Sequence, residues 1–141
     1  MLLRDVMTPN PRAVQPGESL QSAAALMDEL NVGVLPVVEG DRLIGVLTDR
    51  DIVVRSTSAG QDPRTAKVSD AMTTETRTLP EDAPVLEAVR LMEEQQLRRL
   101  PVMGTDGKLA GIVSLGDLAT AGTPEAGDAL EAISTPAEPD R

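Results

Sequence analysis

Two short motifs carry the side chains best suited to bind a ligand. Thr48-x-x-Asp51 and Ser114-x-x-Asp117 each place a hydroxyl and a carboxylate three residues apart, at the end of an apolar run and the start of an expected helix. One carboxylate can accept hydrogen bonds from two adjacent hydroxyl groups, and the free N–H groups at a helix start favour an anion. The motifs therefore suit a ligand that combines a sugar with a phosphate or a carboxylate.

The same spacing is that of a capping box. In this arrangement the hydroxyl accepts a hydrogen bond from the N–H of the acidic residue, and the carboxylate accepts one from the N–H of the hydroxyl residue. Such caps begin helices in many proteins that bind nothing at that place. The two interpretations are compatible because a capping carboxylate can also face a cleft, so both stay open.

Composition narrows the classes of function. The chain has 141 residues, of which 40% are hydrophobic, and it contains no Phe, Tyr or Trp. The core must therefore consist of aliphatic residues and Met, and no aromatic ring can stack on the bases of single-stranded nucleic acid. The net charge of −10 repels a phosphate backbone. We expect no nucleic-acid partner.

The sequence also lacks Cys and His. Thiolate nucleophiles, disulfides, zinc fingers and Ser-His-Asp triads are thereby excluded, and we predict no metal site. No apolar run approaches the roughly 18 residues of a membrane span, and an acidic residue comes too early for a secretory signal. We expect a cytoplasmic protein without a membrane partner.

An internal duplication gives the chain its organisation. Asp5-Val6-Met7-Thr8 recurs 65 positions later as Asp70-Ala71-Met72-Thr73, and Pro36-Val37 recurs as Pro101-Val102. One extra residue at Gly107 changes the offset to 66, and the correspondence then continues to the two acidic residues of the motifs. Self-similarity at a fixed period indicates a repeated structural unit.

The residue pattern of each repeat predicts the order strand, helix, strand, strand, helix. Apolar residues at helical spacing follow Ser19 and Pro84, and two apolar runs separated by a turn predict a hairpin in each repeat. The expected strands are 13–14, 34–38 and 43–47 in the first repeat, and 78–79, 100–103 and 109–113 in the second. The predicted domains are 1–58, first repeat; 59–66, linker; 67–120, second repeat; and 121–141, an acidic tail rich in Pro, Ala and Gly. The tail is expected to be disordered or to form one short helix with Ala126, Ala129, Leu130 and Ile133 on one face.

These residues resemble a known family. Val-Met-Thr, Leu-Pro-Val-Val and Gly-Val-Leu-Thr-Asp-Arg-Asp-Ile, with their second copies Ala-Met-Thr, Leu-Pro-Val-Met and Gly-Ile-Val-Ser-Leu-Gly-Asp-Leu, resemble the cystathionine β-synthase (CBS) domain. The resemblance covers residues 1–120 and implies an α/β fold of two βαββα repeats packed sheet to sheet as one tandem pair. It further implies an adenine-containing ligand such as AMP, ADP, ATP or S-adenosylmethionine in the clefts between the repeats, and a homodimer.

The resemblance assigns roles to the two motifs. It implies that Asp51 and Asp117 hold a ribose and that Thr48 and Ser114 bond to sugar or phosphate. It further predicts that each motif is completed by residues of the other repeat. The first cleft would join Thr48, Arg50 and Asp51 to Thr73, Thr76, Thr78, Leu97, Arg98 and Arg99; the second would join Ser114 and Asp117 to Thr8, Pro11, Ala13, Val32, Gly33 and Val34.

The two predicted clefts differ in charge. The first contains Arg98 and Arg99, whereas Gly33 and Val34 stand at the matching positions of the second. Because a phosphate on so acidic a protein needs guanidinium groups, we expect the Thr48/Asp51 cleft to bind phosphate. The alternative is that the two arginines form a solvated surface pair.

Three hypotheses for the function follow. The favoured one is a non-catalytic regulatory module that binds an adenine nucleotide or a related adenosyl ligand, needs no cofactor, and transmits the ligand's level to an unknown regulated protein. The alternative is a ligand-free module for dimerisation or protein interaction. An enzyme is least favoured, because Asp51 and Asp117 lie in different repeats without His, Cys or a metal cluster.

Overall fold

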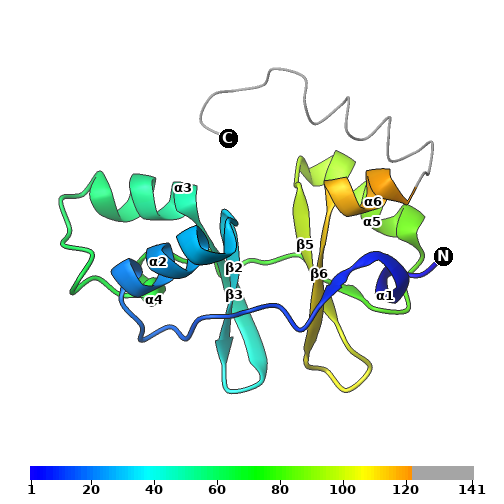
Figure 1. Cartoon of the computed structure of the whole chain (residues 1–141), viewed down its shortest axis with the longest axis horizontal. Coiled ribbons are helices and arrows are strands. Elements are labelled where there is room, and N and C mark those ends of the chain that lie inside the picture. The colour runs from blue at the N-terminus through cyan, green and yellow to red at the C-terminus, as the bar shows by residue number, and fades with distance from the viewer. Residues whose placement is uncertain (122–141) are drawn as a thin grey trace. The chain divides into compact units, whose positions relative to one another are not determined.

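A computed structural model describes residues 1–121 of the chain. These residues form two compact units (Figure 1). The central unit is Pro11–Thr76, and the terminal unit combines Met1–Asn10 with the chain from Arg77 onward. The predicted tail helix lies outside the described residues.

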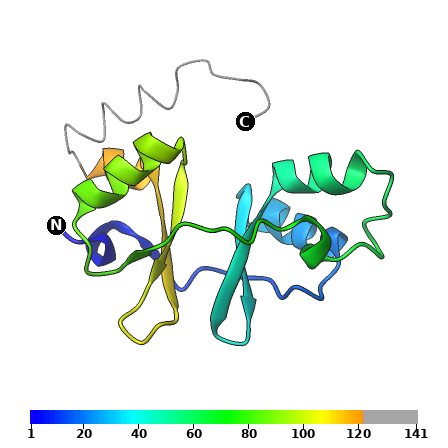
Figure 2. The same ribbon diagram turned by 180° about the vertical axis from the view of Figure 1, so that it is seen from behind.

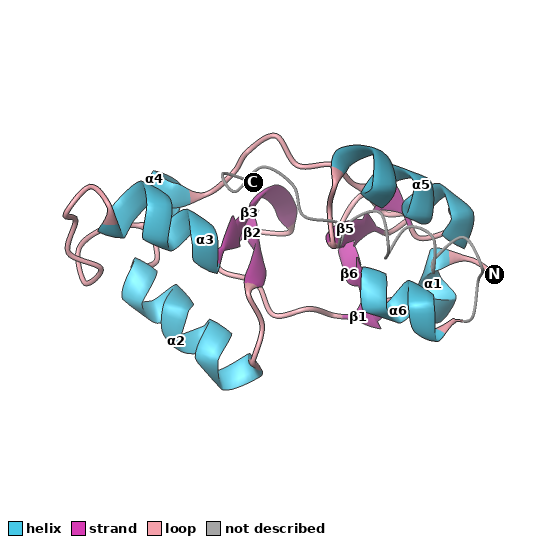
Figure 3. Ribbon diagram, turned by 90° about the horizontal axis from the view of Figure 1, so that it is seen from above, coloured by secondary structure: helices cyan, strands magenta, loops and turns pink. Residues whose placement is uncertain are grey.

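The central unit is built on an antiparallel hairpin of two strands. Its elements are α2 (Leu20–Leu30), β2 (Val34–Glu39), β3 (Arg42–Thr48), α3 (Asp49–Asp51), the π-helix η1 (Ile52–Thr57) and α4 (Val68–Ala71). Isolated bridges extend the hairpin on both sides, since Val14 pairs with Val37 in parallel and Thr73 pairs with Val46 in antiparallel fashion. Helices α2, α3 and α4 cover one face of the hairpin (Figures 1 and 3).

The terminal unit has the same arrangement, with a sheet of four strands. Its elements are α1 (Leu3–Val6), β1 (Thr8–Pro9), β4 (Leu79–Pro80), α5 (Val85–Gln95), β5 (Arg99–Met103), β6 (Leu109–Ser114) and α6 (Leu115–Thr120). The strand order is β1-β6-β5-β4, with β4 parallel to β5 and the other pairs antiparallel. Helices α1, α5 and α6 lie on one side of this sheet (Figure 2).

Each unit is completed by the segment that opens the other sequence repeat. Residues 1–10 open the first repeat but pack in the terminal unit, where Thr8 lies opposite Ile112 in the register. Residues 67–76 open the second repeat but pack in the central unit, where Thr73 and Val46 exchange both main-chain hydrogen bonds, at 2.8 and 3.0 Å. We call residues 1–10 the first arm and residues 67–76 the second arm. Sequence repeats and compact units are therefore different divisions of the chain.

Glycine makes room for both arms. A Cβ atom on Gly45 would lie 2.5 Å from the carbonyl oxygen of Thr73, and one on Gly111 would lie 2.7 Å from that of Thr8. Glycine inside a strand is typical of such a close approach of another backbone. The repeated glycine is thus required by the crossing of the arm.

Aliphatic residues and methionine fill the two cores, as the composition requires. In the central unit Leu20, Leu35 and Leu47 are fully buried together with Val68 and Ala71 of the second arm. In the terminal unit the corresponding cluster includes Met92, Leu100 and Leu118, and Leu3 of the first arm joins it. Each arm therefore contributes apolar burial as well as main-chain hydrogen bonds.

The predicted α/β class and the order of the main elements are confirmed. Helices α1 and α4, of four residues each, were missing from the prediction. Both are single turns in which the side chain of Asp5 or Asp70 accepts a hydrogen bond from the main chain three residues earlier. Such short turns have too few residues to show a helical period.

Candidate functional site

Thr48 ends β3 and begins α3 with a complete capping box. The N–H of Asp51 donates to Oγ1 of Thr48 at 3.0 Å, and the N–H of Thr48 donates to Oδ2 of Asp51 at 3.0 Å. Ser114 and Asp117 make the same pair of bonds at the junction of β6 and α6, at 3.0 and 2.8 Å. The capping interpretation is confirmed in both repeats, and each box uses one of the two carboxylate oxygens.

In each unit the first strand of the hairpin, β2 or β5, lies beside the cap that follows the second strand, β3 or β6. In the central unit the N–H of Asp49 donates to the carbonyl of Gly33 at 2.9 Å, and Val34 lies opposite Thr48. In the terminal unit the N–H of Leu115 donates to the carbonyl of Arg98 at 2.8 Å. Arg99 lies opposite Ser114 in the register of β5 and β6.

The structure groups the other predicted site residues by unit. Thr73 and Thr76 share the central unit with Thr48 and Asp51, and the hydroxyl of Thr76 donates to the carbonyl of Thr73 at 3.3 Å. Thr8 shares the terminal unit with Ser114 and Asp117. The remaining residues lie in the unit opposite to the motif with which they were grouped: Thr78, Leu97, Arg98 and Arg99 in the terminal unit, and Pro11, Ala13, Val32, Gly33 and Val34 in the central unit. Their participation across the repeats stays a prediction.

The surroundings of the two caps differ in charge. In the central unit the Asp49 carboxylate lies against the Cα position of Gly33, where a Cβ would be 3.1 Å from Oδ2. In the terminal unit the matching positions are Leu115 and Arg98, and Arg99 follows. Both arginine side chains belong to exposed residues. The main chain of Arg98 and Arg99 therefore adjoins the terminal cap, whereas the central cap has Asp49 beside Gly33 and Arg50 within its own motif.

Arg55 is a polar partner of the central cap that the sequence analysis missed. Its Nε lies 3.9 Å from Oδ1 of Asp51, and its Nη1 donates to the carbonyls of Ala71 and Met72 at 3.2 and 2.9 Å. The spacing of four residues from Asp51, typical of ion pairs along a helix, was the available signal. Ala121 occupies the matching position of the second repeat.

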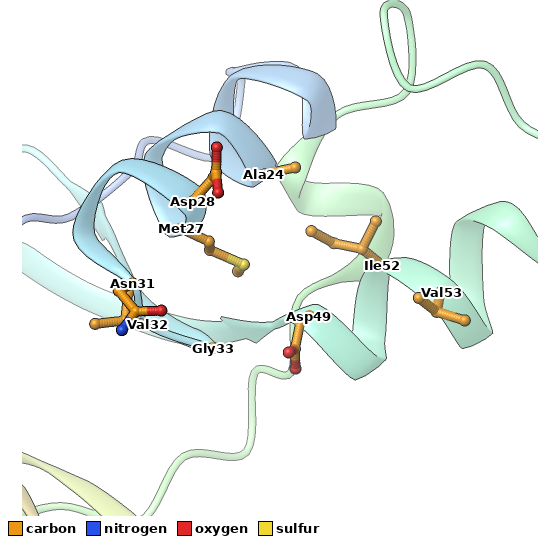
Figure 4. Close-up of a pocket in the computed structure, with 9 residues that line it drawn as sticks. All are labelled: Ala24, Met27, Asp28, Asn31, Val32, Gly33, Asp49, Ile52 and Val53. Carbon is orange, nitrogen blue, oxygen red and sulfur yellow. The ribbon is translucent and has the colours of Figure 1, made fainter.

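A hollow of about 460 Å³ lies inside the central unit between α2 and the α3–η1 segment (Figure 4). The side chains of Met27 and Ile52 point toward one another across it, and the carboxylates of Asp28 and Asp49 lie at its edge. Its lining consists of Ala24, Met27, Asp28, Asn31, Val32, Gly33, Asp49, Ile52 and Val53. It includes two residues of the predicted site, Val32 and Gly33.

Two further properties concern the described part of the chain as a whole. Within residues 1–121, no three Asp or Glu side chains come together in a group that could hold a metal ion. None of the helices in this range is both long enough and apolar enough to cross a membrane.

Comparison with known proteins defines the class to which this fold and these caps belong. The CBS domain model matches twice, at residues 3–57 and 68–123, and the chain belongs to the CBS domain family. The CBS domain-containing protein YhcV of Bacillus subtilis is 43% identical over 134 residues, which are 94% of each chain. This confirms the tandem CBS pair inferred from the repeats.

Two solved structures show the same fold. A crystal structure of hypoxic response protein I with two coordinated zinc ions matches with a TM-score of 0.78 at 38% identity, over 85% of this chain and 98% of that one. CBSX2 of Arabidopsis thaliana in complex with AMP matches with a TM-score of 0.75 at 32% identity, over 86% and 95% of the two chains. One relative therefore carries zinc and another carries AMP.

Proposed function

We propose that this protein is a non-catalytic regulatory module that binds an adenine nucleotide or a related adenosyl compound, such as S-adenosylmethionine, and conveys its level to a partner. The observation that carries the proposal is the repeated cap. Asp51 and Asp117 each use only Oδ2 in the capping box, so Oδ1 lies outside the box and can accept ribose hydroxyls. At Asp117 no ion pair among the described residues engages this atom, whereas at Asp51 it lies 3.9 Å from Nε of Arg55. The AMP complex of CBSX2, which shares this fold, supports an adenosyl ligand.

The charges favour the terminal cap for a phosphate. Arg98 and Arg99 adjoin Ser114 within one unit. The central cap has Arg50 in its motif, but Asp49 lies beside it and Arg55 is engaged with Asp51 and with the carbonyls of Ala71 and Met72. A guanidinium binds phosphate through short charge-assisted hydrogen bonds, while a neighbouring carboxylate repels it. We therefore propose the Ser114/Asp117 cap as the phosphate site within a single unit. The expectation from sequence that the Thr48/Asp51 cleft binds phosphate together with Arg98 and Arg99 stays a prediction.

Material that co-purifies with the protein gives the first test. The purified chain is unfolded and removed by filtration, and the ultraviolet spectrum and mass of the filtrate are recorded. Because the protein contains no Trp, Tyr or Phe, it hardly absorbs near 280 nm, and a nucleotide stands out. An adenine spectrum with a matching mass supports the proposal.

Calorimetric titration of the ligand-free protein then tests the site. AMP should bind saturably, and Asp117→Asn should weaken binding about ten-fold or more, the usual effect of losing a hydrogen bond to a charged group. The double variant Arg98→Gln/Arg99→Gln should lose a similar factor for AMP and little for adenosine. Arg90→Gln removes an exposed arginine from α5 of the same unit and serves as the control for net charge. Equal loss for AMP and adenosine would contradict the placement of the phosphate.

The second candidate is a ligand-free interaction module. The closed capping boxes favour it, because both motifs are already engaged in beginning a helix. Absence of saturable heat with AMP, ADP, ATP and S-adenosylmethionine, together with a blank filtrate, would put this candidate first. The homodimer, the regulated protein and the cytoplasmic location belong to the favoured proposal and stay predictions.

A further inference from the structure

Arg55 connects the central cap with the second arm. Its guanidinium faces Oδ1 of Asp51 on one side and the carbonyls of Ala71 and Met72 on the other. These two carbonyls end α4, immediately before Thr73 pairs with Val46 of β3. One side chain therefore contacts both the carboxylate of the cap and the segment that completes the sheet.

The three contacts are unequal in length. The hydrogen bond to Met72 is 2.9 Å and that to Ala71 is 3.2 Å, whereas the distance to the Asp51 carboxylate is 3.9 Å. The carboxylate and the carbonyls all attract the same planar group of donors, whose fixed shape prevents it from optimising every contact at once. A change at the carboxylate therefore redistributes the contacts of the guanidinium.

The terminal unit has the same cap and the same kind of arm without this connection. Ala121 stands at the position of Arg55, and a methyl side chain can bond neither Asp117 nor the carbonyls of Val6 and Met7. Among the described residues Asp117 makes no ion pair. The chain thus carries its own comparison for the role of the arginine.

We propose that Arg55 is a positioning residue through which the state of the Asp51 carboxylate reaches the second arm. Hydroxyl donors of a ligand, or a neutral side chain at position 51, weaken the attraction between Oδ1 and the guanidinium. The guanidinium then keeps its hydrogen bonds to the carbonyls of Ala71 and Met72 and stabilises the position of the arm. Occupancy of Asp117 has no such effect on the first arm. The use of this coupling by a ligand rests on the proposed function, whereas the coupling itself does not.

A ligand-free double-mutant cycle tests the coupling. Asp51→Asn removes the charge and keeps an oxygen that can accept the hydrogen bond from Thr48. The readout is amide hydrogen exchange of Thr73, whose N–H donates to Val46. Asp51→Asn should slow this exchange about two- to five-fold, the range that a partly exposed ion pair can produce, and the effect should vanish when Arg55 is replaced by Gln.

A matched control comes from the other unit. Asp117→Asn should leave the exchange of Thr8 unchanged, because Thr8 lies opposite Ile112 and no arginine links it to the cap. If Asp51 acts only as a cap, Asp51→Asn changes the exchange of Thr73 equally in the parent chain and in the Arg55→Gln variant, and this result overturns the proposal. An unchanged exchange rate of Thr73 in the parent chain also overturns it. If Arg55→Gln does not fold, Arg55→Lys takes its place; the Asp51→Asn effect must shrink there, and an undiminished effect overturns the proposal.

Titration of the same variants with AMP separates the two proposals. If AMP fails to bind while the cycle shows coupling, the proposed function falls and the role of Arg55 stands. If AMP binds while the cycle shows no coupling, only the role of Arg55 falls.

Discussion

The central unit begins α3 and the terminal unit begins α6 with the same kind of capping box, and the residues around the two boxes differ in charge. At the central cap Asp51 faces Arg55, and Asp49 lies beside Gly33. At the terminal cap Asp117 has Ala121 in place of that arginine, and Arg98 and Arg99 stand where Gly33 and Val34 stand in the other repeat. Both repeats keep the hydroxyl and the Asp of the capping box, while the residues beside the box, which could select a ligand, differ.

This contrast separates two roles that one motif combines. The capping box satisfies main-chain N–H groups at the helix start, and that requirement is the same in both units. The side chains beside the box are not needed to satisfy these main-chain groups. They are the place where two copies of one unit can acquire different binding properties.

The largest expected effect concerns a feature that the two units share. Gly45→Ala and Gly111→Ala should each lower the free energy of unfolding by about 1 to 3 kcal/mol, because the new methyl group overlaps the carbonyl of the crossing arm. Gly45 should cost more, since its nearest neighbour is backbone at 2.5 Å, whereas at Gly111 the nearest atom is the flexible end of Met7 at 2.6 Å. Urea unfolding measures both.

Gly17→Ala is the matched control for these variants. No atom lies within 4 Å of the Cβ that it would add, and no left-handed φ is required there. Its stability should remain within about 1 kcal/mol of the parent or rise. A loss as large as that of Gly45→Ala would show that the arms are not the reason for the glycines.

A smaller effect should distinguish the two long helices. The hydroxyl of Ser19 accepts a hydrogen bond from the N–H of Ser22 at 3.0 Å and caps α2, whereas α5 begins at Pro84 without a side-chain cap. Ser19→Ala should therefore cost about 1 kcal/mol. Pro84→Ala removes no hydrogen bond and should cost less, as thermal unfolding can verify; the reverse order would contradict the difference.

The smallest effect concerns a surface pair in the segment before α4. Arg64 donates to Asp62, at 2.9 Å from its Nη2, and its side chain holds the pKa of the Asp62 carboxyl below the ordinary value. Because the pKa is lowered in the folded state, the pair's contribution to stability is present above the unfolded pKa and is lost as the pH falls through the folded value. Arg64→Gln should raise the pKa of Asp62, measured by NMR titration, with hardly any change in stability, because both side chains are exposed to solvent. An unchanged pKa would contradict this assignment.

The sequence alone predicted the local features that occur in both repeats. Apolar spacing after Ser19 and Pro84, the paired hairpins and the caps at Thr48 and Ser114 all appear in the structure. Each depends on interactions between residues close in the chain, and its presence twice excluded chance. The duplicated caps are therefore the part of the candidate site that the sequence predicted best.

Long-range features could not be predicted in this way. The spacing of Thr73 and Val46 shows nothing of their pairing, so neither repeat by itself indicated the exchange of arms; only the family resemblance grouped Thr73 with the Thr48 motif and Thr8 with the Ser114 motif. The contacts of Arg55 depend on the same exchange, because Ala71 and Met72 lie 16 and 17 residues away along the chain. The sequence predicts that Arg98 and Arg99 bind phosphate, and this stays a prediction; their adjacency to Ser114 became visible only in the hairpin register.

The exchange of arms also determines which unit can be completed first during synthesis. The central unit is one continuous stretch, Pro11–Thr76, and all of it is made before strand β6 of the terminal unit. The first arm is made before the central unit, yet its partner strand β6 ends at Ser114. Leu3, fully buried in the folded protein, therefore cannot complete its packing until about a hundred further residues have been added, at the translation rates of 5–20 residues per second that are usual in cells. Residues 1–10 thus complete the terminal unit only after its last strand has been made.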